Sequence, residues 1–473
     1  MRGDFSRDSF DAKAGFSGVL KLQGRVQLDA DDNENLAILL HHLRTLAMDV
    51  IGKHGGPDGE SIGIDVKFPT TTTNFDFAIT PGRYYVEGLL CENWEVCAYR
   101  GNDDLPAPRQ PWYPSPDPPA KSATYIAYLE VWERSVSAVE NDPSRPMATP
   151  GMLREVALGG VDSADRRQLL WRVRLGPAPA GRPLPAHNDD SRQGDLLWAE
   201  WVALWHGLPR GKMRAQIKEP TGDDSNPCVI SPRAAYRGLE NQLYRIEICR
   251  GGPAYPDPQS ANAPEAATFV WSRNNAGTAF AVESVSGNEV RLAETWRDGR
   301  SAIGRGDFVE LSDPFTRLEP GPGPIYRVEH YDPDSAILTL DQPSAIQAAS
   351  ATAGVVLRPW DHVERKANTG VPPIANDHAL KLIEGRPLTL EDGIEIWFEP
   401  NAAGGPANEY RKGDYWMFEA RTDLGRIVWP RDGSHQRLMP PHGTRYYYAP
   451  LAVIKFDGDG VPTLVTDTRR VID

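Results

Sequence analysis

The chain has 473 residues, of which 40% are hydrophobic and 25% charged, a composition typical of a folded protein with about two to four domains. Its formal net charge of −14 disfavours nucleic acid and anionic membranes as partners, because both attract basic surfaces. The 43 glycines and 42 prolines exceed average usage, and such frequent punctuation indicates many short strands joined by turns.

An extended arm and one long helix open the chain. Residues 1–28 are predicted to be extended, with a short strand at 18–22. The acidic stretch from Asp29 to Glu34 offers capping oxygens and negative charge for a helix start. Leucines then recur at helical spacing as far as Leu46, and Gly52 follows Ile51. The pattern predicts one long helix that is capped by this acidic stretch and ends at Gly52.

Period-two patterns replace helical ones after this helix. Residues 75–79 and 83–89 alternate around Pro81-Gly82 and are predicted to form a hairpin. The proline-dense residues 104–119 indicate a stiff linker or a surface loop. Residues 125–132 are apolar on both faces, which predicts a central strand, and residues 169–175 are expected in the same sheet.

Three tryptophans, Trp198, Trp201 and Trp205, share one face of a predicted short helix. Aromatic faces can stack on sugars, so a carbohydrate platform is one interpretation. The other is a helix that docks its aromatic stripe on the sheet, and this interpretation is favoured.

The rest of the chain is read as two further β regions. Residues 235–345 are predicted to form a small barrel or sandwich, with a hairpin around residues 331–334. Further strands are expected at 394–398, 415–418, 427–429 and 448–454. The fold class is therefore mainly β, with multi-domain sandwich or barrel units and one long N-terminal helix. The predicted divisions are 1–60, 61–211, 212–370 and 371–473.

Signatures of catalysis, cofactors or metals are missing from the sequence. It has no nucleophile elbow, Walker loop, Rossmann glycine pattern or zinc-protease helix. The four cysteines, Cys91, Cys97, Cys228 and Cys249, lack metal-ligand spacing and are expected to be reduced thiols in or near the core. We therefore expect no metal, no cofactor and no enzymatic activity.

A glycosidase needs only two facing carboxylates, and several acidic residues of predicted strands could supply them. The candidates are Glu240, Glu247, Glu395, Asp414 and Glu419. With 65 acidic residues in the chain, such a set is expected by chance. A polysaccharide hydrolase therefore stays a minor alternative.

The N-terminus lacks the apolar stretch of a signal peptide, and no segment is apolar for long enough to span a membrane. We expect the protein to be made in the cytoplasm and not to insert into a membrane. If it leaves the cell, it is expected to do so as part of a larger particle.

Several motifs are distinctive. The opening residues include Gly3-Asp4-Phe5-Ser6-Arg7-Asp8-Ser9-Phe10 and Gln23-Gly24-Arg25-Val26-Gln27-Leu28-Asp29-Ala30-Asp31. Later ones include Tyr236-Arg237-Gly238-Leu239-Glu240-Asn241, Phe269-Val270-Trp271-Ser272-Arg273-Asn274 and Gly413-Asp414-Tyr415-Trp416. The chain resembles a family of bacterial proteins encoded beside baseplate and tail proteins of contractile injection systems. Members of that family tend to have tryptophan where this chain has Asp32.

The resemblance implies a structural component in or around the baseplate or spike of a phage-tail-like particle. Its partners would be baseplate, spike or sheath and tube proteins, with a homo-oligomer or ring expected in the assembly. A carbohydrate-binding receptor or adhesin module of the particle is the main alternative. Later motifs such as Trp-Ser-Arg-Asn combine turns with charged groups and are expected to fix loop shape and strand register.

The arm before the helix is the predicted attachment element. The candidate assembly contacts are Phe5, Arg7, Phe10, Phe16 and Arg25. Spaced aromatic side chains on an extended segment suit binding in a groove of a neighbouring subunit. Packing of the arm on its own domain is an equal alternative. If the arm is an attachment element, deleting residues 2–17 should leave a folded protein that no longer enters the particle.

Overall fold

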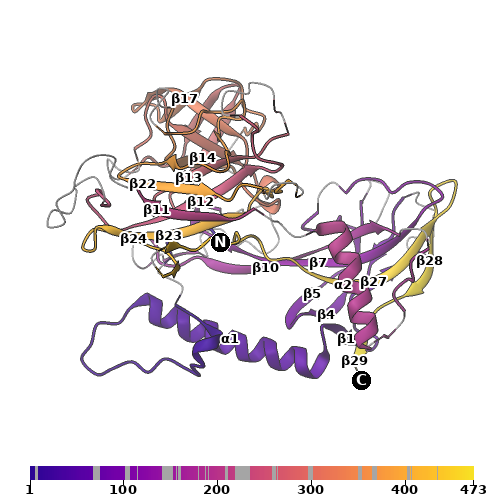
Figure 1. Cartoon of the computed structure of the whole chain (residues 1–473). Helices are drawn as coiled ribbons and strands as arrows, with labels where there is room; N and C mark the ends of the chain where they lie inside the picture. The colour runs from indigo at the N-terminus through magenta and orange to yellow at the C-terminus, as the bar shows by residue number, and fades with distance from the viewer. Residues whose placement is uncertain are drawn as a thin grey trace. The chain divides into compact units, whose positions relative to one another are not determined.

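A computed structural model describes the chain except for residues 6–8, 68–74, 102–106, 114–115, 141–152, 156, 158–160, 179–180, 187, 190, 208–210, 219–234, 258–262, 264, 297–301, 350–353, 365–369, 402–404, 406, 434 and 473. The fold is mainly β, with several sheets, a six-stranded barrel and one long helix near the N-terminus (Figure 1), which confirms the predicted fold class.

The chain divides into two compact units, and each is assembled from separate stretches of sequence. Unit 1 comprises Met1–Phe5, Ser135–Arg167 and Pro209–Thr444. Unit 2 comprises Ser6–Arg134, Gln168–Leu208 and Arg445–Asp473. This division differs from the four consecutive ranges expected from the sequence, because strands that are far apart along the chain share sheets.

Three sheets make up most of unit 2. Their strands are β1 (His54–Pro57), β2 (Ile64–Asp65), β3 (Ala78–Ile79), β4 (Gly82–Val86), β5 (Leu89–Asn93), β6 (Cys97–Ala98), β7 (Thr124–Val136), β10 (Arg166–Pro177), β27 (Tyr447–Phe456), β28 (Pro462–Asp467) and β29 (Val471–Ile472). The strand orders are β29-β1-β4-β5, β10-β7-β27-β28 and β2-β3-β6. As predicted, β7 and β10 are neighbours in one sheet.

Strand β7 is apolar on both faces because each face packs against a different partner. Ala127, Leu129 and Val131 belong to the core that the three sheets share. Ile126 and Tyr128 face the other way and pack against helix α2 (Arg192–His206). The tryptophan stripe of α2 supplies that packing, with Trp198 and Trp201 buried. The docked-helix interpretation is therefore confirmed, and these two rings are not an exposed carbohydrate platform.

Helix α1 (Asp29–Ile51) is the predicted long helix, and it ends at Gly52 as expected. Its N-cap residue is Leu28, and no side chain caps it, so the predicted capping by the acidic stretch is wrong in detail. Those acidic residues lie inside the first turn, where they still favour the helix dipole. The described residues of the arm contain a single 3-10 turn, η1 (Ala12–Ala14), and residues 18–22, where a strand was predicted, form none.

The hairpin predicted around Pro81-Gly82 is also wrong. Strand β3 pairs with β2 and β6, whereas β4 pairs with β1 and β5, so the Pro-Gly turn connects two different sheets. The hairpin partner of β4 is β5, and Glu87 and Gly88 join them with φ of 44° and 77°. Two successive left-handed residues make the two-residue turn that matches the strand twist.

Part of the proline-dense stretch packs on unit 2 as a loop. Gln110 is buried, and its side-chain amide donates to the Tyr99 carbonyl at 2.8 Å. Trp112 is buried as well. The described residues 107–113 are therefore part of the unit 2 fold, which favours the loop interpretation over a linker.

Unit 1 holds the barrel and a sandwich. Its elements are η2 (Ala138–Glu140), β8 (Arg154–Glu155), β9 (Val161–Asp162), β11 (Met213–Ile217), β12 (Gln242–Arg250), β13 (Thr268–Ser272), β14 (Phe280–Ser286), β15 (Glu289–Leu292), β16 (Phe308–Ser312), η4 (Thr316–Leu318), β17 (Ile325–Asp332), β18 (Ile337–Leu340), β19 (Val356–Trp360), β20 (Leu380–Lys381), β21 (Leu388–Thr389), β22 (Ile394–Phe398), β23 (Tyr415–Arg421), β24 (Arg426–Val428), β25 (Arg431–Asp432) and β26 (His435–Gln436).

The sandwich and the barrel have separate cores. Sheets β11-β22-β21 and β20-β13-β12-β23-β24 enclose one apolar core, with Phe269, Phe398 and Trp416 fully buried. The closed barrel β14-β15-β18-β17-β16-β19 encloses another. The hairpin predicted around residues 331–334 is the β17–β18 pair.

Three of the four cysteines lie among the described residues. Cys91, Cys97 and Cys249 are buried free thiols, as expected. The fourth, at position 228, is outside the described residues.

Candidate functional site: a buried charge cluster around Arg2

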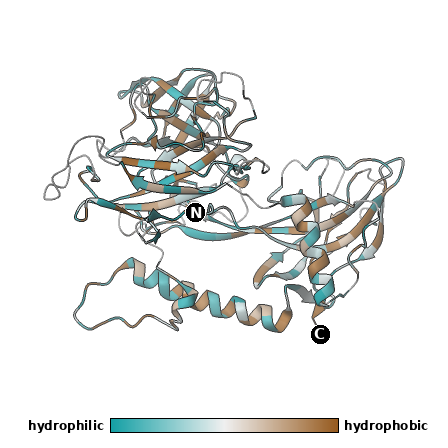
Figure 2. Ribbon diagram, viewed as in Figure 1, coloured by the Kyte–Doolittle hydropathy of each residue, from teal (hydrophilic) through white to brown (hydrophobic). Residues whose placement is uncertain are grey.

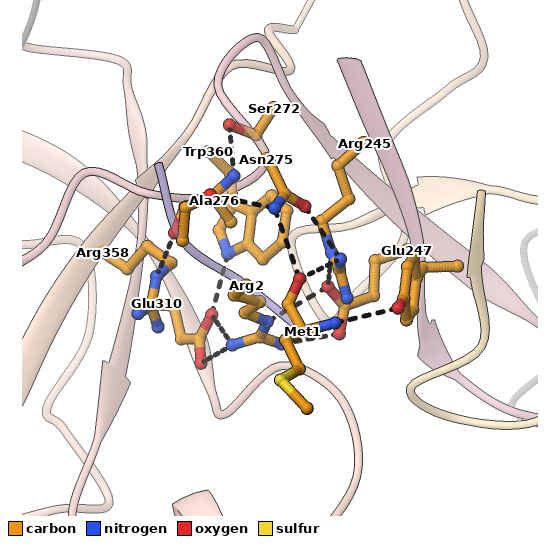
Figure 3. Close-up of polar contacts among 12 residues, drawn as sticks. Met1, Arg2, Arg245, Glu247, Ser272, Asn275, Ala276, Glu310, Arg358 and Trp360 are labelled. Carbon is orange, nitrogen blue, oxygen red and sulfur yellow. Dashed lines mark hydrogen bonds and ion pairs between the residues drawn. The ribbon is translucent and has the colours of Figure 1, made fainter. Parts of the chain in front are cut away.

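Arg2 lies between two buried carboxylates of unit 1 (Figure 3). Its guanidinium donates two hydrogen bonds to Glu247, at 2.8 and 3.1 Å, and two to Glu310, at 3.0 and 3.2 Å. The same group lies over the ring of Trp360, 5.4 Å from its centroid. A guanidinium is a planar fork of five donors, so one arginine can satisfy two carboxylates at once. Arg2 thereby fixes the first residues of the chain to unit 1.

The strand periodicity explains how these carboxylates come to be buried. On β12, Tyr244, Ile246 and Ile248 face the sandwich core, so Glu247 points to the opposite side of the sheet. Glu310 is the central residue of β16, a strand of the barrel. The cluster lies where the five-stranded sheet and the barrel pack together within unit 1.

Asn275 holds the backbone of the first residues. Its side-chain amide donates to the carbonyl oxygens of Gly3, at 2.9 Å, and Met1, at 3.3 Å, while its own backbone carbonyl accepts the Gly3 N–H at 3.2 Å. Arg245 donates to the Met1 carbonyl at 3.2 Å and to the Asn275 side chain at 3.0 Å. Gly3 has a φ of 150°, and a Cβ there would lie 2.5 Å from the Phe5 ring. Position 3 therefore accepts glycine, and any larger residue would require the neighbouring side chains to rearrange.

The charges in the cluster neutralise one another. Burial alone would raise the pKa of Glu247, but Arg2 and Arg245 outweigh it and lower the pKa to about 2. Burial also acts on Glu310, and Arg2 and Arg358 likewise hold its pKa below the usual range. Both carboxylates therefore stay ionised at neutral pH. A carboxylate in this state cannot donate a proton, so the cluster is suited to holding structure and not to acid catalysis.

The carboxylates considered for a glycosidase each have different surroundings. Glu247 is paired with arginines in the cluster. Glu395 on β22 accepts from the Thr389 hydroxyl at 3.3 Å, and Glu419 on β23 pairs with Arg421. Asp414 differs, because burial raises its pKa to about 7. Glu240 lies in the loop that leads into β12.

The predicted assembly contacts have different surroundings. Phe5 is half-buried in unit 1. Phe10 is half-buried in unit 2, with its ring centroid 5.5 Å from that of a histidine on α1. Phe16 and Arg25 are exposed, and position 7 is outside the described residues. Packing on the chain itself thus holds for Phe5 and Phe10, while Phe16 and Arg25 remain available to a partner.

Sequence reasoning missed the role of Arg2. The available signal was Glu247, which lies between Ile246 and Ile248 on β12, because a buried carboxylate requires a cation. A deletion that starts at residue 2 removes Arg2 together with the arm. It would leave Glu247 and Glu310 without this partner, so the deletion cannot separate folding from attachment.

The arm and α1 carry an exposed apolar surface, which we call the outer surface. Ten of the exposed large apolar side chains among the described residues lie within it: Phe16, Leu20, Leu22, Val26, Leu28, Leu36, Leu39, Leu43, Leu46 and Val50. Figure 2 shows the hydrophobic and hydrophilic residues alternating along α1. Within α1, Ile38 is the one buried residue.

Two further features were sought in the described part of the chain. It contains no group of three or more histidine, cysteine, aspartate or glutamate side chains placed to hold a metal ion. Neither α1 nor α2, as described, combines the length and apolar character needed to cross a membrane.

Comparison with known proteins places the chain in a family. The model of DUF6519, a family of unknown function, matches residues 1–191 and 202–458. These ranges contain Arg2, Glu247 and Glu310 as well as the whole outer surface. Searches of curated proteins and of solved structures gave no match. The chain belongs to the DUF6519 family.

Proposed function

We propose that the chain is a non-catalytic structural subunit of a phage-tail-like contractile injection particle, in or around its baseplate or spike. It binds neighbouring subunits through the arm and α1. The observation that carries the proposal is the outer surface, which concentrates ten exposed apolar side chains between Phe16 and Val50. Exposed apolar patches larger than a few hundred Å² are uncommon on monomers and mark sites of association.

The arm supports a role in contacting a partner. Leu20, Leu22 and Val26 are between 71% and 89% exposed, although they are large apolar residues. The arm is nevertheless tied to α1: the Val19 N–H donates to the Asn35 side chain at 3.2 Å, and Lys21 pairs with Asp32 at 2.5 Å. A segment held in place with its apolar side chains outward is prepared for binding at low entropic cost.

The choice of a phage-tail-like particle rests on the resemblance of the sequence motifs to those of proteins encoded beside tail and baseplate genes. The charge cluster supports a structural role, because its carboxylates are neutralised by arginines and are unsuited to proton transfer. In this proposal the protein is made in the cytoplasm, and its partners are baseplate, spike or sheath and tube proteins.

The test is recovery with particles. A tagged chain is expressed in a bacterium that encodes it, particles are purified, and the bound proteins are identified by mass spectrometry. The wild type should be recovered with sheath, tube and baseplate proteins. The double variant Leu20→Ser/Leu22→Ser should fold normally and be recovered at least tenfold less.

The matched control is Leu239→Ser in unit 1, because Leu239 is 97% exposed and lies outside the outer surface. It should be recovered like the wild type. Absence of the wild-type chain from purified particles would overturn the proposal. Equal recovery of the double variant and the wild type would show that the arm does not bind the particle.

A further inference from the structure

Helix α1 presents a regular apolar seam, which we define as Leu36, Leu39, Leu43, Leu46 and Val50. The spacing alternates between three and four residues, which is the heptad pattern of a coiled-coil interface. All five side chains are between 53% and 72% exposed. Such a repeat brings the same helix face to a partner over two heptads, and the five side chains of this face are exposed among the described residues.

The opposite face of α1 is the one that fixes the helix to the rest of unit 2. Ile38 is 1% exposed, and Arg44 pairs with Glu133 of β7 at 2.7 Å. Gly88 allows this close approach, because a Cβ there would lie 2.6 Å from the Arg44 carbonyl oxygen. The helix is therefore already formed and immobilised before any association. The free energy of binding through the seam is therefore not reduced by the free-energy cost of forming the helix.

We propose that the seam binds a second copy of this chain, α1 against α1 in an antiparallel pair. The proposal deepens the proposed function and rests on it for the biological setting. A heptad seam is matched by another helix with the same repeat, and each copy carries one. Two identical faces related by a twofold axis satisfy each other completely, which gives a closed dimer.

Charge decides the direction of the two helices. The first turn of α1 contains Asp29, Asp31 and Asp32, and its last turn contains no basic residue, with Lys53 just beyond the helix end. A parallel pair would place the two acidic turns together. An antiparallel pair centred on Leu43 places the acidic turn of one copy beside Lys53 of the other, and it also opposes the helix dipoles favourably.

The arm supplies the remaining area. The seam covers residues 36–50, a length of about 22 Å at 1.5 Å per residue. Two short helices alone fall below the roughly 1,000 Å² of a stable specific interface. The exposed arm side chains Leu22, Val26 and Leu28 directly precede the helix and extend the apolar surface. The dimer therefore buries the seam together with the end of the arm.

Self-association is measured on the purified full chain by sedimentation velocity over a concentration series. The wild type should be a dimer, and Leu39→Glu/Leu43→Glu should raise the dissociation constant at least a hundredfold. The matched control is Leu196→Glu/Leu204→Glu on α2, whose leucines are 50% and 53% exposed. It should dimerise like the wild type. Circular dichroism checks that both variants keep their fold.

Cysteine cross-linking tests the direction. An equal mixture of the Leu36→Cys and Val50→Cys proteins should form a disulfide-linked dimer on mild oxidation, whereas either protein alone and the wild type should not. A monomeric wild type, dimerisation that survives the seam variant, or cross-linking of Leu36→Cys with itself would each overturn the proposal. Because particles are not used in these assays, the outcome is separable from that of the proposed function.

Discussion

Arg2 binds Glu247 through two hydrogen bonds, at 2.8 and 3.1 Å, although the two residues are 245 positions apart in the chain. The contact fixes the beginning of the chain on the back of strand β12. It also determines the charge state of a buried carboxylate, so its loss has a definite energetic consequence.

Replacing Arg2 should destabilise unit 1. Arg2→Ala leaves Glu247 and Glu310 buried without this cation, and breaking a buried pair in this way costs about 3–5 kcal/mol. Arg2→Lys keeps the charge but lacks the planar fork, so it should cost less than Arg2→Ala. The measurement is urea unfolding, with hydrogen exchange of β12 and β16 peptides to locate the effect. Arg25→Ala, at an exposed arginine, is the control and should change stability by less than about 0.5 kcal/mol.

Asp414 should make unit 1 less stable as the pH rises. Burial raises its pKa from 3.8 to about 7, so the folded state binds a proton that the unfolded state releases. The stability from this group is fully present below about pH 4 and is lost as the pH rises through 7. Asp414→Asn removes the dependence, and the variant should gain on the order of 2–4 kcal/mol over the wild type at pH 8 compared with pH 4. Urea unfolding at both pH values measures it; an equal difference at the two would contradict the prediction.

His362 should act in the opposite direction. Burial lowers its pKa to about 4, so its contribution is present above pH 6.5 and is lost as the pH falls through 4. Because Asp414 and His362 oppose each other, Asp414→Asn should leave unit 1 acid-sensitive between pH 6.5 and 4. Adding His362→Gln to the Asp414→Asn variant should remove that acid sensitivity. Glutamine keeps a donor for the His378 carbonyl, which His362 Nε2 reaches at 2.8 Å. If stability falls equally with pH in Asp414→Asn with and without His362→Gln, His362 does not control the acid sensitivity.

Gly88 should be intolerant of a side chain. Gly88→Ala combines a φ of 77° with a Cβ 2.6 Å from the Arg44 carbonyl oxygen, so α1 must move away from the β4–β5 turn. Gly59→Ala is a matched control, because its φ is 69° and no atom lies within 4 Å of the added Cβ. The control should cost about 1–2 kcal/mol from left-handed backbone strain, and Gly88→Ala about 1–3 kcal/mol more. Thermal unfolding followed by circular dichroism compares the two; equal losses would mean that the helix contact contributes nothing.

Local patterns were enough to predict some elements. Helix α1 follows from leucine spacing and Gly52, and β7 follows from its run of apolar residues. The docked stripe of α2 also followed, since Trp198 and Trp201 share one helix face. These features depend on residues within one or two turns of each other, so a single sequence contains the information.

Other features depend on distant partners. The sequence around Glu247 indicates that a cation is needed but not that Arg2 supplies it, and the pairing of β12 with β23 has no local signal, because each contact joins segments more than a hundred residues apart. The Pro81-Gly82 hairpin failed because Glu87-Gly88 makes the turn that strand twist favours. Of the predicted contact residues, Phe16 and Arg25 have the expected exposure, whereas the seam of α1 was read as ordinary helical spacing.

The order of strands has a consequence for synthesis on the ribosome. Strands β14 to β19 of the barrel follow one another in the chain, so the barrel can close while later residues are still being translated. The central sheet of unit 2 is different, because β7 pairs with β27 and must wait until Tyr447 has emerged. Strand β1 waits longer still, for Val471. The nascent chain therefore carries half-built apolar sheets in this unit until the strands from β27 to β29 have emerged.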